Sequence, residues 1–91
     1  MDEQTIIMRC QQGDLYLLDD LVRLHADSLY RYCYYLSGNA DEAGELFQET
    51  WLKALRHIKK CKADRPMLGW LFTIAVNIQR DKYRRNKRWF N

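Results

Sequence analysis

The sequence is poor in residues that break helices, with one proline and four glycines in 91 residues. It shows no strand pattern, internal repeat or low-complexity tract, so we expect an all-α fold. No run of 18 apolar residues occurs, and the acidic N-terminus has an apolar run of only three residues, which excludes a membrane-spanning helix and a signal peptide. We therefore expect no membrane partner. A chain of this length makes one domain, so we expect a single domain over 1–91.

Cysteine and histidine are few and scattered. Cys10, Cys33 and Cys61 are odd in number and lack CxxC spacing, which excludes a disulfide framework and a zinc site. His25 and His57 lie in different predicted helices without acidic or cysteine residues at metal-ligand spacing. We expect His25, at a core-facing position, to be packed, and His57, in a basic neighbourhood, to be solvated. No Ser/His/Asp arrangement and no phosphate-binding glycine loop is present. We therefore expect a cytoplasmic protein that is not an enzyme and has no metal or cofactor.

Acidic side chains are concentrated in the first half of the chain and basic ones in the second. Residues 1–52 contain 3 basic and 10 acidic side chains, whereas residues 53–91 contain 12 basic and 2 acidic ones. A basic half this dense suggests a phosphate backbone or an anionic membrane surface as its partner. The acidic half would repel nucleic acid and suits a basic protein surface.

Apolar residues recur at helical spacing in four stretches, which predict helices over 2–12, 15–36, 39–58 and 66–89 in a compact bundle. Gly13 is placed to end the first helix, because glycine accepts a left-handed conformation. Asp14, Asn39 and Asp64 are placed to cap the second, third and fourth helices, with Glu42 as the partner of Asn39 in an approximate capping box.

The fourth predicted helix has two different faces. Its inward face carries Leu68, Leu71, Phe72, Ala75 and Ile78, and its outward face carries Thr73, Asn77, Arg80, Arg84 and Lys87. Together with the cations of the preceding loop, the outward cations suit a phosphate backbone, which gives sequence-independent and salt-sensitive affinity. Thr73 and Asn77 are residue types that hydrogen-bond base edges. Trp70 and the cluster of Tyr30, Tyr34 and Tyr35 suit base stacking or the core, and for Trp70 we favour the core.

The third predicted helix has an outward face with one apolar residue. Glu45, Gln48, Glu49 and Arg56 share this face with Leu52. A single exposed leucine is common in proteins of any function. Beside two carboxylates and an amide, it also suits a small protein-binding patch.

Three segments in this order resemble domain 2 of the extracytoplasmic-function (ECF) group of bacterial sigma factors. The segments are GDLYLLDDLVRLH (13–25), EAGELFQETWLKA (42–54) and GWLFTIAVN (69–77), followed by the basic RDKYRRNKR (80–88). The resemblance covers essentially the whole chain, from the first helix to the basic end. It implies a compact helical bundle that binds core RNA polymerase and promoter DNA to support transcription initiation.

The resemblance also implies two sets of site residues. Residues implied in docking on the clamp helices of the polymerase beta-prime subunit are Glu45, Leu46, Gln48, Glu49, Leu52, Lys53 and Arg56, with packing as the alternative for Leu46. Residues implied in binding the non-template strand of the minus-ten element are Ile58, Lys59, Lys60, Lys62, Arg65, Thr73, Asn77, Arg80, Arg84, Arg85, Lys87 and Arg88. The loop Ile58–Arg65 and Asn77 would hold a flipped-out base, and the cations of the basic end would hold phosphates. An anti-sigma factor stays open as a further partner.

The chain departs from the family pattern in several places. Gly44 and Glu45 stand where an acidic pair is common, and Ile58 stands where an aromatic residue is expected. The loop sequence KKCKADR (59–65) is basic and long and lacks a Phe-Arg-Gly-like segment, so no base preference is carried over. Family members continue into a second domain that binds the minus-thirty-five element, whereas this chain stops at Asn91, so we expect an isolated domain or a truncated chain.

Two other hypotheses remain open from the sequence. A helix-turn-helix-like bundle would place the basic fourth helix in the major groove of duplex DNA, or would act as a protein-interaction module. The apolar start of that helix speaks weakly against the first of these, because recognition helices contact bases with their N-terminal residues. The second hypothesis, which we rank last, makes Lys82–Phe90 a basic membrane-surface segment.

Overall fold

The computed structural model describes residues 1–90, with side chains described as far as Lys87. Its helices are α1 (Glu3–Gln11), α2 (Leu18–Ser37), α3 (Ala40–Arg56) and α4 (Met67–Phe90), and two short 3-10 helices, η1 (Leu15–Leu17) and η2 (Ile58–Lys60), lie between them. Over the described residues the chain contains no strand. The predicted all-α bundle of about four helices is therefore confirmed.

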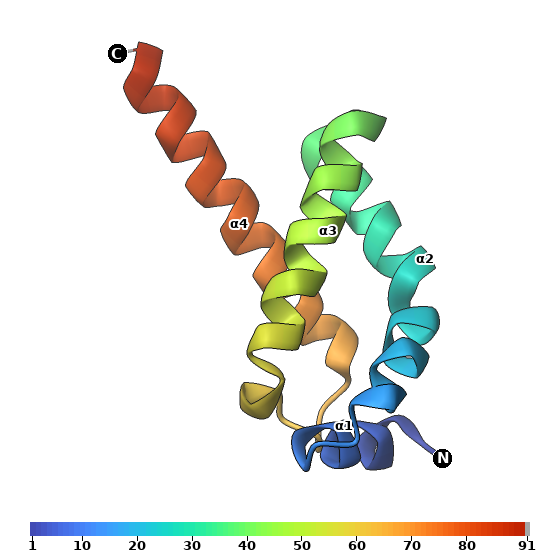
Figure 1. Cartoon of the computed structure of the whole chain (residues 1–91). Helices are drawn as coiled ribbons and strands as arrows, with labels where there is room; N and C mark the ends of the chain where they lie inside the picture. Colours follow the sequence, from blue (N-terminus) through green and yellow to red (C-terminus); the bar gives the residue numbers. More distant parts are fainter. Residues whose placement is uncertain (91) are drawn as a thin grey trace.

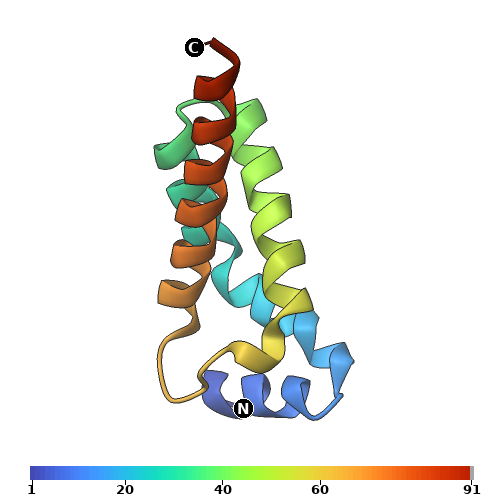
Figure 2. The ribbon, with the colours of Figure 1, turned by 90° about the vertical axis from the view of Figure 1, so that its left-hand side faces the viewer.

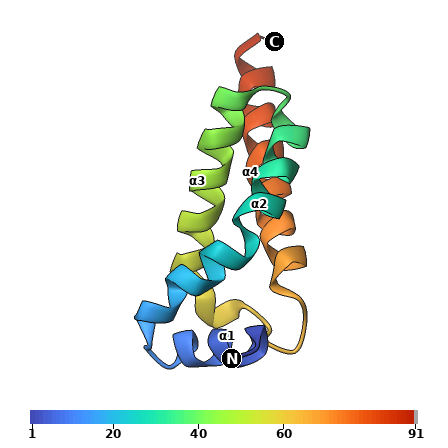
Figure 3. The ribbon, with the colours of Figure 1, turned by 90° about the vertical axis from the view of Figure 1, so that its right-hand side faces the viewer.

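The helices form a three-helix bundle with one short helix across its end. α2, α3 and α4 lie side by side, and α1 crosses beneath them next to the segment that joins α3 to α4 (Figures 1 and 2). The C-terminal part of α4 extends beyond the bundle (Figure 3), and the molecule measures 48 × 22 × 20 Å. None of the helices in the described part of the chain is both long and apolar enough to cross a membrane.

Two of the predicted helix ends are confirmed. The Asn39 side chain accepts a hydrogen bond from the Glu42 N–H at 2.8 Å and so caps α3. Gly13 follows the end of α1 with a φ of 107°, a left-handed conformation that disfavours residues with a Cβ atom. The first turn of α1 is capped in the same way, since Thr5 N–H donates to Asp2 at 2.8 Å.

The structure corrects the caps predicted at Asp14 and Asp64. Asp14 makes no capping bond, because its carboxylate accepts from Arg9 Nε at 2.9 Å, and the segment after it begins as the 3-10 helix η1 rather than as α2. At the start of α4, the Met67 N–H donates to the Glu3 carboxylate at 3.1 Å. This first-turn donor is therefore satisfied by Glu3 of α1 rather than by Asp64 of the preceding loop.

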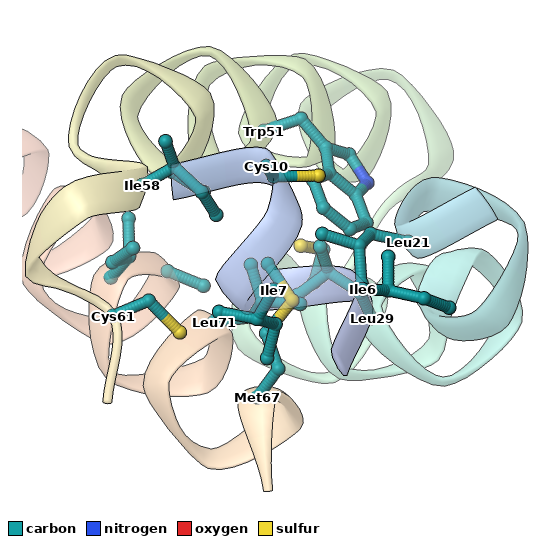
Figure 4. Packing of buried hydrophobic residues seen from close by; sticks show 14 of the residues in the cluster. Ile6, Ile7, Cys10, Leu21, Leu29, Trp51, Ile58, Cys61, Met67 and Leu71 are labelled. Carbon is teal, nitrogen blue, oxygen red and sulfur yellow. The ribbon is translucent and has the colours of Figure 1, made fainter. Parts of the chain in front are cut away.

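The core joins all four helices. Ile7 of α1, Leu21 and Leu29 of α2, and Met67 and Leu71 of α4 are fully buried, and Figure 4 shows them converging beside Trp51 of α3. In α4 the predicted inward residues Leu71 and Ala75 are buried, whereas Leu68, Phe72 and Ile78 are half-buried. Met67 and Ile74, which the predicted face omitted, are also buried. The buried face of α4 is therefore rotated slightly from the predicted one.

The three cysteines are free and buried. Burial in the apolar core raises the pKa of all three thiols, and it raises the pKa of Cys33 to about 11. A neutral thiol is the form that an apolar interior favours. These cysteines therefore act as small apolar core residues in the native chain.

Removing the α3 cap should destabilise the chain. We expect Asn39→Ala to lower the free energy of unfolding by about 1 kcal/mol, because the Glu42 N–H loses its acceptor. Urea unfolding followed by circular dichroism measures this change. Asn39→Asp keeps an acceptor and should retain the wild-type stability, so equal losses in both variants would contradict the assignment of the cap.

Stability should fall at alkaline pH because of Cys33. The unfolded chain loses the thiol proton near pH 9, whereas the native chain retains it up to about pH 11, so stability is constant below the first value and falls above it. Between pH 7.5 and 10.5 we expect the Cys33 contribution to fall by about 2 kcal/mol. Urea unfolding at both pH values measures the loss. A Cys33→Ala variant with the same pH dependence would show that other groups cause it.

Candidate nucleic-acid and protein interfaces

The outward face of α3 forms a continuous exposed surface. Six of the residues predicted to bind polymerase are exposed: Glu45, Gln48, Glu49, Leu52, Lys53 and Arg56. The opposite face of the helix is buried. There the Thr50 hydroxyl donates a hydrogen bond to the Leu46 carbonyl at 2.7 Å. Burial of that face fixes the rotation of α3 and leaves Leu52, which is 63% exposed, at the centre of the polar face.

Leu46 does not belong to this surface. Its side chain is 3% exposed and packs in the core. Of the two predictions for Leu46, a polymerase contact or core packing, this burial supports packing. Glu45 is exposed and its carboxylate lies 3.5 Å from Lys82 Nζ of α4. An exposed ion pair of this kind contributes little stability, so Glu45 stays available to a partner.

A hollow of about 640 Å³ lies between α3 and the second half of α4. It is lined by Glu49, Leu52, Lys53 and Arg56 from α3 and by Ile78, Asp81, Arg84 and Arg85 from α4. Arg84 and Arg85, which the sequence analysis grouped with the DNA-binding cations, therefore share one groove with four predicted polymerase contacts. Leu52 and Ile78 are the apolar residues of this lining, and its other side chains are charged.

A second hollow, of about 490 Å³, lies between the α3–α4 loop (residues 61–66) and the start of α4. Its lining contains Lys60, Lys62, Arg65, Pro66, Gly69, Trp70 and Thr73. Four residues that were predicted to bind DNA thus line one pocket. Trp70 is half-buried: it packs against the core, which the sequence favoured, and it also forms part of the pocket wall. Pro66 and Gly69 were missed because neither carries a polar group.

Other predicted DNA-binding residues lie outside this pocket. Ile58, which was predicted to lie beside a flipped base, is 7% exposed and packs in the core, apart from the residues that line this pocket. Asn77 is exposed one turn after Thr73, whose hydroxyl donates to the Gly69 carbonyl at 3.0 Å. Lys59, Arg80 and Lys87 are exposed as well. The Arg88 side chain lies outside the described residues.

The α3–α4 loop is held at both ends and exposed between them. Cys61 is 4% exposed and Met67 is 0% exposed, so each anchors one end in the core. Between them the Arg65 N–H donates to the Lys62 carbonyl at 3.2 Å, which closes a turn. Lys62 and Arg65 are exposed on this turn. The arrangement presents two cations at the mouth of the pocket.

The tyrosines form an aromatic stack between α2 and α4. The Tyr32 ring lies 4.1 Å from the Phe72 ring at an interplanar angle of 19°, and the Tyr35 ring lies 6.1 Å from the Tyr32 ring at 21°. Tyr35 is 79% exposed. Tyr34, at 48% exposed, lies on the surface as well. Tyr30, at 38% exposed, completes the predicted cluster, so all three of its rings are exposed, whereas Tyr32, which the cluster omitted, packs against the core.

The histidines have structural surroundings. His25 is largely buried and its Nε2 pairs with the Glu3 carboxylate, which agrees with the predicted packed histidine. His57 is half-buried at the C-terminal end of α3, where we had predicted a solvated side chain. Among the described residues no group of three His, Cys, Asp or Glu side chains is placed to hold a metal ion.

Curated proteins similar to this chain are ECF RNA polymerase sigma factors. SigW of Bacillus subtilis is 32% identical over 89% of this chain and 43% of its own length. SigE of Mycolicibacterium smegmatis is 41% identical over 77% of this chain and 27% of its own length. EcfG of Rhodopseudomonas palustris is 42% identical over 79% of this chain and 39% of its own length. The chain thus spans less than half of the length of each of these relatives.

Two solved structures share the fold. An engineered region 2 of sigmaE, in an NMR structure of its complex with GTAAAA, matches with a TM-score of 0.84 at 23% identity, over 97% of this chain and 92% of that one. CnrH, in complex with the cytosolic domain of CnrY, matches with a TM-score of 0.75 at 23% identity, over 87% of this chain and 51% of that one. Residues 21–89 match the family described as Sigma-70 region 2. The chain therefore belongs to the sigma-70 region 2 family, and its relatives place it in the ECF group.

Proposed function

We propose that this chain is the promoter-recognition domain of an ECF-type sigma factor, which binds core RNA polymerase and the single-stranded minus-ten element during transcription initiation. The observation that carries the proposal is the pocket beside the α3–α4 loop, where Lys62 and Arg65 of the loop lie beside Trp70 at the start of α4. It combines cations for phosphates with an aromatic ring for a base. The complex of the similar sigmaE region 2 with GTAAAA supports a nucleic-acid ligand.

We propose that a base enters this pocket and that neighbouring groups read the strand. Trp70 offers a ring for stacking, and the exposed amide of Asn77 offers a donor and an acceptor for a base edge. Extruding a base costs a few kcal/mol, which a pocket recovers by stacking and hydrogen bonding. Arg80 and Lys87 lie further along α4 and would contact phosphates, which fixes the register of the strand.

We propose that the outward face of α3 is the polymerase-docking surface, with the beta-prime clamp helices as its partner. It presents Leu52 among Gln48, Glu49 and other polar side chains, which is the composition of a small interface with an apolar centre. We assign Arg84 and Arg85 to this surface as well, because they line the groove beside Leu52. An anti-sigma factor would compete for the same groove, and the CnrH complex with the cytosolic domain of CnrY supports a protein ligand for this fold.

The duplex-DNA alternative has less support. A helix-turn-helix module contacts bases through the N-terminal residues of its recognition helix. In α4 those residues include Met67 and Leu71, which are fully buried. On this proposal the domain acts by binding in the bacterial cytoplasm, and it is not itself catalytic.

Replacing Leu52 should weaken polymerase binding. We expect Leu52→Ser to raise the Kd for core RNA polymerase about tenfold or more, because the variant loses the burial of one leucine side chain. Leu24→Ser on α2 is the matched control, since Leu24 is exposed to a similar extent (56% against 63%). Fluorescence anisotropy with the labelled chain measures both. Equal binding by the two variants would show that α3 is not the docking surface.

Replacing Asn77 should reduce base discrimination rather than overall affinity. The control is Asn86→Ala, because Asn86 is also an exposed asparagine of α4. Against single-stranded oligonucleotides selected from a random pool, we expect Asn77→Ala to lose roughly 1–3 kcal/mol of discrimination at one base. Electrophoretic mobility shifts with each single-base variant measure this. A uniform loss across all four bases would assign Asn77 to the backbone.

A further inference from the structure

The N-terminal helix α1 lies directly against the segment that carries the proposed base pocket. Glu3, Ile7 and Gln11 are spaced by four residues, so they share one face of α1. Ile7 is fully buried in the core at the centre of that face (Figure 4). The polar residues at its two ends both bond to the stretch 58–67, which runs from the end of α3 to the first residue of α4.

Gln11 holds the beginning of the α3–α4 loop. Its side-chain Nε2 donates to the Ile58 carbonyl at 3.0 Å and to the Cys61 carbonyl at 2.7 Å. Both hydrogens of the amide are thereby used, and Gln11 itself is half-buried. The two carbonyls belong to η2 and to the first residue of the loop, so one side chain fixes the exit of the chain from α3.

Glu3 holds the end of the same loop. One carboxylate oxygen accepts from the Met67 N–H at 3.1 Å, and the other pairs with His25 Nε2 of α2. The first residue of α4 is therefore tied through α1 to α2. The carboxylate also lies at the N-terminal end of α4, where the helix dipole favours a negative charge.

We propose that α1 is a positioning element that keeps the base pocket preformed, by bonding the start of the loop through Gln11 and its end through Glu3. This inference rests on the proposed function of the pocket. α1 lies before residues 21–89, which match the family, so the family motifs do not assign it this role. Between the two held ends, one bond joins the loop to itself within the described residues, from Arg65 N–H to the Lys62 carbonyl. A loop whose ends are fixed has less conformational freedom to lose when a base binds.

The first test measures the loop without DNA. In Gln11→Leu we expect the Cys61 and Arg65 amides to exchange hydrogen about tenfold faster, as local opening becomes easier, with the α3 amides unchanged. Hydrogen exchange of the whole chain by NMR measures this residue by residue. Gln12→Leu is the matched control, because Gln12 is the adjacent glutamine and is exposed. Glu3→Gln, which keeps one acceptor but removes the charge, should affect the amides near Met67 first.

The second test measures recognition. The probes are the single-stranded oligonucleotide that the unmutated chain enriches from a random pool and a scrambled version of it. We expect Gln11→Leu to lower the ratio of the two affinities about tenfold while binding to core RNA polymerase stays unchanged. If Gln11 only stabilised the fold, Gln11→Leu would weaken oligonucleotide discrimination, polymerase binding and thermal stability together.

The outcomes separate the two proposals. Unchanged loop exchange in Gln11→Leu, or faster exchange with full discrimination retained, overturns the positioning role of α1. Failure of the unmutated chain to enrich any oligonucleotide overturns the proposed function of the pocket instead. Faster loop exchange together with lost discrimination and intact polymerase binding supports the positioning role.

Discussion

The first half of α4 is the constraint on which both surfaces depend. Met67, Leu71 and Ala75 are fully buried against α1, α2 and α3, and this packing fixes the rotation of the helix along its whole length. Because a helix presents side chains at 100° per residue, burying one stripe determines where every other residue points. Thr73 and Asn77 are consequently exposed, and the same rotation turns Ile78 and Arg85 toward α3.

Packing also divides the basic half of the chain into two surfaces. Lys62 and Arg65 belong to the pocket at the start of α4, whereas Arg84 and Arg85 belong to the groove beside Leu52. The acidic and basic halves are separate only in the sequence. In space, the Glu45 carboxylate of α3 lies 3.5 Å from Lys82 Nζ of α4. The pocket and the groove therefore share no cation, although both lie along the same helix.

Local patterns in the sequence predicted the elements well. Apolar spacing gave the four helices, the Asn39 cap is confirmed, and the exposed polar face of α3 lies where the spacing placed it. These features depend on residues within one or two turns of each other, which is why spacing is sufficient to predict them. The family motifs added the assignment to sigma-70 region 2, which residues 21–89 confirm.

By itself, then, the sequence determined the helices, their polar and apolar faces and the family. Tertiary structure decided which end of α4 shares a groove with α3, the place of Trp70 in a pocket wall, and the burial of Leu46 and Ile58. It also replaced the predicted caps, since Asp14 pairs with Arg9 and Glu3 binds the Met67 N–H. The bonds from α1 to the loop join residues 47 to 64 positions apart. Such contacts follow from the packing of whole helices, which no local spacing encodes.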